Sequence, residues 1–200
     1  MLGLPKSTEI KKQLPKTAIY AKFHMNTAEK AKIDSDIARI TIVNEITASK
    51  INVAEGQEIK SFYILQVILK KKDYSEKNIL TISKLIPQNI IFALEYDEKI
   101  RLASCIDSYL LQGEWKKAED VSLSLNGLNM DAVWKDIIKN IEQGDWNDKL
   151  SVKENIDIRI KINKLNKEIA KLEKQARAER QPKKKFELVQ RINNLRGVKL

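Results

Sequence analysis

The chain contains little cysteine or histidine, the two residue types that many catalytic and metal-binding sites use. Cys105 is the only cysteine, so no internal disulfide can form, and this fits a reducing cytoplasm. His24 is the only histidine, and one histidine with one cysteine cannot make a zinc site of the usual kind. No neighbour of His24 suggests that it is held as a catalytic base. We therefore predict no catalytic residues, no metal and no cofactor.

Glycine and long apolar runs are also scarce. The six glycines are too scattered to form the phosphate loop of an ATPase or a dinucleotide-binding loop. No stretch approaches the roughly 20 apolar residues that span a bilayer. The first six residues lack the long apolar run of a signal peptide. We expect a soluble, cytoplasmic protein without a membrane partner.

Positive charge is concentrated near the end of the chain. The 200 residues include 37 Lys/Arg and 27 Asp/Glu, a net charge of +10. Residues 152–200 hold 15 Lys/Arg and 6 Asp/Glu, a net charge of +9, whereas residues 1–151 hold 22 and 21, a net charge of +1. A near-neutral body with a basic extension is typical of proteins that bind nucleic acid, anionic lipid or an acidic protein.

Residues 1–143 are predicted to form an α+β body. Apolar alternation and buried runs favour a mostly antiparallel sheet of four to five strands, with helices on one side. Strands are expected near residues 40–44, 59–69, 89–96, 99–106 and 121–125, with a tight turn at Asp97-Glu98 before the fourth. Short helices cut by prolines are expected before residue 26, and longer ones over 27–37, 75–86 and from Asp131 to near Gly144.

After a linker at residues 144–151, residues 152–200 are predicted to form a basic coiled-coil helical arm. Apolar residues recur there in steps of four and three, the spacing of a coiled-coil seam. They are Ile158, Ile162, Leu165, Ile169, Leu172 and Ala176. Four alternating isoleucines at 156–162 also fit a strand, but no breaker separates them from the heptads, which favours helix.

A second, shorter helix is expected after Pro182, so the simplest arrangement of the arm is an antiparallel helical hairpin. Its apolar residues are Phe186, Val189, Ile192 and Leu195, with Leu188 beside them. A coil of under three heptads is marginal alone. The arm should therefore fold back on itself, form a homodimer or dock on another chain.

The arm also contains the predicted nucleic-acid-binding residues. Lysines of the first helix are interpreted as spread around it, whereas residues 177–185 form a dense basic run at the tip of the hairpin. Such a run would contact phosphates without reading sequence, and binding would be sensitive to salt. The predicted residues are Arg177, Arg180, Lys183, Lys184, Lys185 and Arg191. The alternative is a solvated coiled-coil surface with no ligand.

Seam residues and one tryptophan are the predicted partner interface: Ile162, Leu165, Ile169, Leu172 and Trp115. Trp115 lies near the end of an element, where it can contact a partner or cover the linker. The alternative is that it packs where the arm docks on the body. Trp134, on the apolar face of a helix, is expected in the core.

A metal-dependent nuclease is the catalytic alternative. Such enzymes need clustered carboxylates with a nearby lysine to hold Mg²⁺ and polarise water. Acid-x-Lys triplets begin at Glu58, Asp97 and Glu114, but a chain this charged contains such triplets by chance. No partner aspartate on a neighbouring strand is evident for any of them.

Motifs in order along the chain resemble a bacterial family catalogued as domain of unknown function 4391. They are Leu4-Pro5-Lys6-Ser7-Thr8, Ile51-Asn52-Val53, Ile86-Pro87, Ile90-Ile91-Phe92-Ala93-Leu94-Glu95-Tyr96, Gly127-Leu128-Asn129, Trp134, Leu172-Glu173-Lys174 and Phe186. The resemblance implies an accessory protein encoded beside helicases and DNA methyltransferases in restriction-like or phage-defence clusters. It implies no established catalytic residues.

Together these observations predict a non-catalytic accessory subunit. It would bind DNA, a helicase or methyltransferase partner, or both, through its basic arm. A small nuclease and a pure assembly protein that dimerises through the arm are the alternatives.

Overall fold

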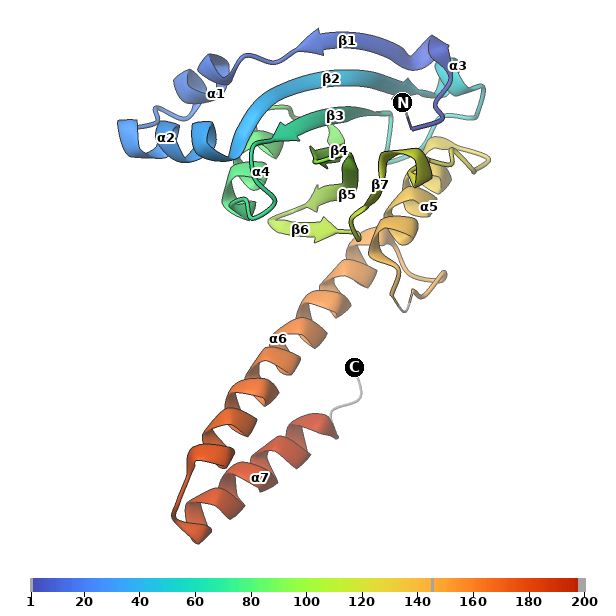
Figure 1. Cartoon of the computed structure of the whole chain (residues 1–200). Coiled ribbons are helices and arrows are strands. Elements are labelled where there is room, and N and C mark those ends of the chain that lie inside the picture. Colours follow the sequence, from blue (N-terminus) through green and yellow to red (C-terminus); the bar gives the residue numbers. More distant parts are fainter. Residues whose placement is uncertain (1, 145, 198–200) are drawn as a thin grey trace. The chain divides into compact units, whose positions relative to one another are not determined.

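A computed structural model describes residues 2–144 and 146–197, and the chain divides into two compact units, which are described separately (Figure 1). The first unit, Met1–Trp146, is called the body. The second, Asn147–Leu200, is called the hairpin unit. The division falls inside the range 144–151 that the sequence indicates as a linker. None of the described helices is both long enough and apolar enough to cross a bilayer.

The described part of the body contains a mixed sheet of seven strands in the order β1-β2-β3-β4-β5-β6, with β7 also paired to β5. The strands are β1 (Glu9–Gln13), β2 (Ile37–Thr47), β3 (Ser61–Leu69), β4 (Asn89–Tyr96), β5 (Lys99–Ile106), β6 (Tyr109–Gln112) and β7 (Lys116–Lys117). The α+β class and the mostly antiparallel sheet are confirmed. The predicted number of strands is too low, and β3 and β4 are parallel.

The parallel pair and the hairpin beside it have different connections. A crossover containing α4 (Glu76–Ser83) joins β3 to β4, as parallel strands require. Strands β4 and β5 are joined by Asp97 and Glu98 alone, with φ of 47° and 59°. Positive φ at both positions is the geometry of a two-residue turn that matches strand twist. The tight turn predicted there is confirmed.

The prediction omits three strands, β1, β6 and β7, and includes one strand that is absent. The five residues of β1 are all exposed at the sheet edge, so they show no apolar alternation, and β6 has only four residues. The strand predicted at 121–125 is wrong. Val121 and Leu123 are buried alternately with exposed neighbours, and the Leu123 N–H donates to Leu2 O at 3.0 Å. The segment is extended, but it joins no ladder.

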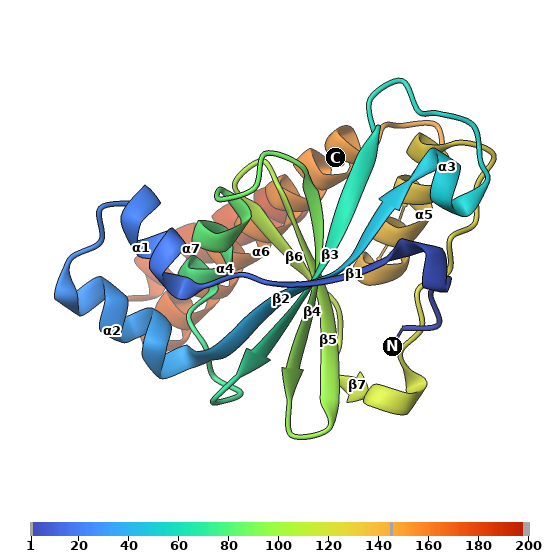
Figure 2. The ribbon, with the colours of Figure 1, turned by 90° about the horizontal axis from the view of Figure 1, so that it is seen from above.

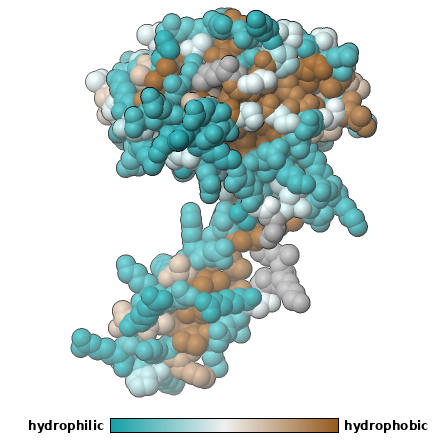
Figure 3. Space-filling model, turned by 45° about the vertical axis from the view of Figure 1, so that its right-hand side comes forward, coloured by the Kyte–Doolittle hydropathy of each residue, from teal (hydrophilic) through white to brown (hydrophobic). Residues whose placement is uncertain are grey.

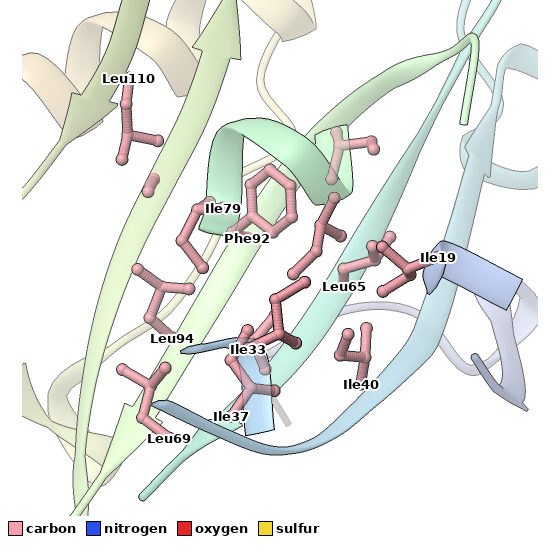
Figure 4. Close-up of a cluster of buried hydrophobic side chains, with 14 of the residues drawn as sticks. Ile19, Ile33, Ile37, Ile40, Leu65, Leu69, Ile79, Phe92, Leu94 and Leu110 are labelled. Carbon is pink, nitrogen blue, oxygen red and sulfur yellow. The ribbon is translucent and has the colours of Figure 1, made fainter. Parts of the chain in front are cut away.

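Helices cover both faces of the sheet, so the prediction of helices on one side is wrong (Figure 2). One face packs against α1 (Lys16–Lys22), α2 (Thr27–Asp36) and α4, in a cluster that includes Ile19, Ile33, Leu65, Ile79 and Phe92 (Figure 4). The opposite face packs against α5 (Met130–Glu142), where the Phe62 and Trp134 rings lie 5.3 Å apart. Phe62 and Leu65 point oppositely because side chains alternate along a strand.

Polar side chains set the ends of the body helices. Asn26 caps α2 in a reciprocal box with Glu29. Asn129 caps α5 by accepting from the Ala132 N–H. Gly127 lies so close to this helix start that a Cβ there would be 2.6 Å from Val133 N. Short helices complete the body: the 3-10 helices η1 (Lys6–Thr8) and η2 (Ala118–Asp120), and α3 (Ala48–Ile51).

The hairpin unit consists of α6 (Val152–Ala178) and α7 (Pro182–Arg196), and the predicted helical hairpin is confirmed (Figure 1). Ser151 caps α6 in a box with Glu154. Because residues 156–162 lie inside α6, their isoleucine alternation reflects composition and not a strand. The two helices share a small apolar core. It consists of Leu172, Ala176 and Ile192, with Ile169, Leu188 and Leu195 packed around them.

Candidate nucleic-acid interface

The connection between α6 and α7 places five basic side chains on the surface at the hairpin tip. Arg177 lies in the last turn of α6, Arg180 lies in the connection and Lys183, Lys184 and Lys185 lie in the first turn of α7. All five are exposed. Pro182 begins α7, and the N-cap residue Gln181 makes no side-chain cap hydrogen bond. Basic side chains and the positive end of a helix dipole therefore occupy the same turn.

One acidic group reduces the charge of this tip. Glu179 Oε1 accepts a hydrogen bond from the Gln181 N–H at 2.9 Å. That bond, with the nearby charge of Lys184, holds the pKa of Glu179 below its usual range. Residues 177–187 hold five Lys/Arg and two Asp/Glu, so the tip keeps a net charge of +3.

Arg191, the sixth predicted contact residue, lies further along α7. Its Nη2 is 2.8 Å from Glu168 Oε1 on α6. Arg196 forms a similar pair with Glu173 at 2.6 Å. Both arginines remain more than half exposed, but their charge is matched locally. The structure therefore separates Arg191 from the five tip residues.

The predicted partner-interface residues are dispersed. Ile169 and Leu172 pack against α7 inside the hairpin, which leaves them little surface for another chain. Ile162 and Leu165 continue the same stripe toward the start of α6 and are half-buried. Trp115 packs against the core of the body, and its ring lies under the Arg101 guanidinium, 4.9 Å from ring centroid to Cζ.

Two apolar side chains of α7 form an exposed surface that the sequence pattern did not separate from the core. Phe186 is 63% exposed and Val189 is 40% exposed. Helical spacing gives the signal, because residues 188, 192 and 195 share one face, from which residues 186 and 189 diverge. Hydrophilic side chains cover much of the visible surface of the hairpin unit (Figure 3).

The acid-x-Lys triplets do not form one site. Asp97 belongs to the β4–β5 turn, and the Glu58 N–H donates to Asp131 at 3.2 Å in a separate loop. Glu114, Lys116 and Asp120 do line one cleft of the body, about 470 Å³ in volume, beside β5 and α5. Across residues 2–144 and 146–197, no three His, Cys, Asp or Glu side chains gather closely enough to hold a metal ion.

The most strongly bound carboxylates of the body serve its structure. Asp131 accepts hydrogen bonds from the backbone N–H groups of Gln57, Glu58 and Ile59, which fix the loop before β3. Burial works against this, but the three donors hold the pKa of Asp131 below its ordinary value. Asp36 is buried among donors in the same way. Neither carboxylate is free to act on a ligand.

Comparison with known proteins gives one match. A family model described as Domain of unknown function (DUF4391) matches residues 2–197. No curated protein and no solved structure matches the chain.

Proposed function

The chain belongs to the DUF4391 family, and from this membership and the surface of the hairpin unit we propose that it is a non-catalytic accessory subunit of a bacterial restriction-like or phage-defence complex. In this proposal it binds DNA and a helicase or DNA methyltransferase partner. One observation carries the proposal: nearly all the excess charge of the chain lies on residues 152–200, and five of its basic side chains are exposed together at the tip.

Phosphate contact is the chemistry that such a tip supports best. Lysine ammonium groups act as mobile point charges and do not read bases. Binding gains free energy because phosphates neutralised by lysine release condensed counterions. The expected ligand is therefore DNA of any sequence, with an affinity that falls steeply as salt rises.

A protein partner is the second part of the proposal. Exposed aromatic side chains are enriched at the centre of protein interfaces, where they bury large area at small entropic cost. Phe186 with Val189 fits that description. The same surface also suits a second copy of the chain, in which case the hairpin would mediate assembly.

Changing Lys183, Lys184 and Lys185 together to glutamine should weaken binding to duplex DNA at least about tenfold at low salt. Loss of three phosphate contacts should also reduce the slope of log K against log[salt] by about 2.7. Fluorescence anisotropy with a labelled duplex, measured over a series of salt concentrations, gives both quantities.

The matched control is Lys32, Lys72 and Lys77 to glutamine. These lysines are exposed on the body, so the control makes the same change in net charge away from the tip. It should leave both affinity and slope nearly unchanged. Equal losses in the two triple variants would show that net charge matters and the tip does not.

A metal-dependent nuclease is a second candidate, because Glu114, Lys116 and Asp120 line one cleft. If the cleft is catalytic, purified protein with Mg²⁺ or Mn²⁺ should cut DNA, and Glu114→Gln should reduce cleavage by on the order of 100-fold. Our first proposal predicts no cleavage by either protein. Metal-dependent cutting that Glu114→Gln abolishes would replace it.

A further inference from the structure

Four lysines of α6 lie on one side of the helix, although the six basic residues between positions 161 and 177 are together spread around it. Lys164, Lys167, Lys171 and Lys174 are spaced three, four and three residues apart, and all are exposed. At about 100° per residue, they fall within a sector of about 80°. They are called the lysine stripe. With a rise of about 1.5 Å per residue, the stripe extends for about 15 Å.

The stripe is separate from the face of α6 that packs on α7. The packed residues Ile169, Leu172 and Ala176 fall outside the sector that the lysines occupy. None of the four lysines forms an ion pair with another residue of 2–144 or 146–197. Lys167 and Lys171 border an open groove of about 530 Å³ along the hairpin, which is also lined by Leu172, Gln175 and the ion pair of Glu168 with Arg191.

Helix α7 keeps the acids of α6 from neutralising the stripe. In an isolated helix, Glu168 would be placed to pair with Lys164 or Lys171, and Glu173 with Arg177. In the hairpin, Glu168 pairs instead with Arg191 and Glu173 with Arg196. Neither glutamate falls in the sector of the stripe. The hairpin fold therefore leaves four cations uncompensated along one line.

The composition of the stripe favours phosphates over an acidic protein as its ligand. Protein interfaces are depleted in lysine and enriched in aromatic residues, methionine and arginine. Between residues 164 and 174 the sector of the stripe holds lysine alone, without an arginine or an aromatic residue. The exposed Phe186 and Val189 lie on the other helix. Each strand of duplex DNA presents a phosphate about every 3.4 Å along the axis, so a row of about 15 Å spans about four phosphates of one strand.

We infer that the lysine stripe is a second, extended phosphate-contact surface, which holds the backbone of duplex DNA along α6 while the tip contacts it at one end. This inference rests on the proposed function, since it concerns the same ligand. It adds that binding depends on the length of α6 and on the two arginines of α7 that form ion pairs with glutamates of α6. The stripe would then add four possible phosphate contacts to the five that the tip offers.

The test compares the full chain with the variant Lys164→Gln, Lys167→Gln, Lys171→Gln and Lys174→Gln. Glutamine has a helix propensity close to that of lysine, so α6 should persist, which circular dichroism checks. The slope of log K against log[salt] for a labelled DNA duplex should fall by about 3.6, and affinity at low salt should fall more than in the tip triple variant. The control changes Lys32, Lys72, Lys77 and Lys99 of the body to glutamine.

The outcomes separate the stripe from the tip. A large loss in the stripe variant, with little change in the control, supports the inference. An unchanged slope in the stripe variant, with a loss in the tip variant, overturns the stripe and leaves the proposed function standing. If the unaltered chain does not bind duplex DNA, both fail, and an acidic protein becomes the ligand to test.

Discussion

Replacing Asp36 with alanine should lower the free energy of unfolding of the body by about 3–5 kcal/mol, which is much of the stability of an ordinary domain. The Asp36 carboxylate is buried where α2 meets β2. It accepts hydrogen bonds from Ser75 N at 2.8 Å, Asn78 Nδ2 at 2.7 Å and Lys71 Nζ at 2.8 Å. Alanine would leave those donors without their acceptor, and the buried Asn78 amide would bear the desolvation cost of an unpaired donor.

The loss should depend on pH with a definite sign. Burial by itself raises the pKa of Asp36, but hydrogen bonds from Lys71, the Ser75 N–H and Ser35 outweigh it, so the folded pKa lies below the ordinary value. A lowered folded pKa contributes stability above the unfolded pKa of about 3.9, and that contribution disappears as pH falls through the folded pKa. The difference between the protein and the alanine variant should therefore shrink below about pH 4.

Urea unfolding followed by tryptophan fluorescence measures this directly, because Trp115, Trp134 and Trp146 all lie in the body. Asp36→Asn keeps an acceptor oxygen without the charge and should lose less stability. Asp73→Ala, at an exposed position nearby, should change stability by less than about 0.5 kcal/mol. Equal stability of the Asp36→Ala and Asp73→Ala variants would show that the buried network contributes nothing.

Replacing Ile192 with aspartate should separate α7 from α6. Ile192 is one of only three buried residues in the core of the hairpin. An unpaired charge there costs several kcal/mol, more than so small a core can offset. Helices of this length are marginal in water without packing, so α7 should lose most of its helicity. Circular dichroism at 222 nm should fall, while the tryptophan unfolding transition of the body stays in place.

The same variant links the fold of the hairpin to DNA binding. Once α7 separates, Glu168 and Glu173 lose Arg191 and Arg196 and can pair with neighbouring cations of α6. DNA affinity should then fall although no lysine has changed. Gln190→Asp is the matched control, since it places the same charge on α7 at an exposed position outside the tip. Unchanged helicity and DNA affinity in Ile192→Asp would contradict both the packing and the charge argument.

Local pattern was sufficient for several elements because their signals lie within a few residues. The apolar run at 90–94 and the two-residue turn at 97–98 led to β4 and β5 at their observed bounds. The heptad spacing after Ile158 led to α6, and Pro182 marked the break before α7. The edge strand β1 was not predicted, because a fully exposed strand needs no apolar alternation.

Composition and residue spacing were enough to establish the class of the body, the existence of the helical hairpin and the concentration of positive charge on it. The folded chain was needed to establish the parallel pairing of β3 with β4, the covering of both sheet faces and the partners of Glu168 and Glu173. Each of these joins residues far apart in sequence, so no local pattern contains it. The basic arm was evident from counting, but which lysines remain uncompensated depends on where α7 folds back.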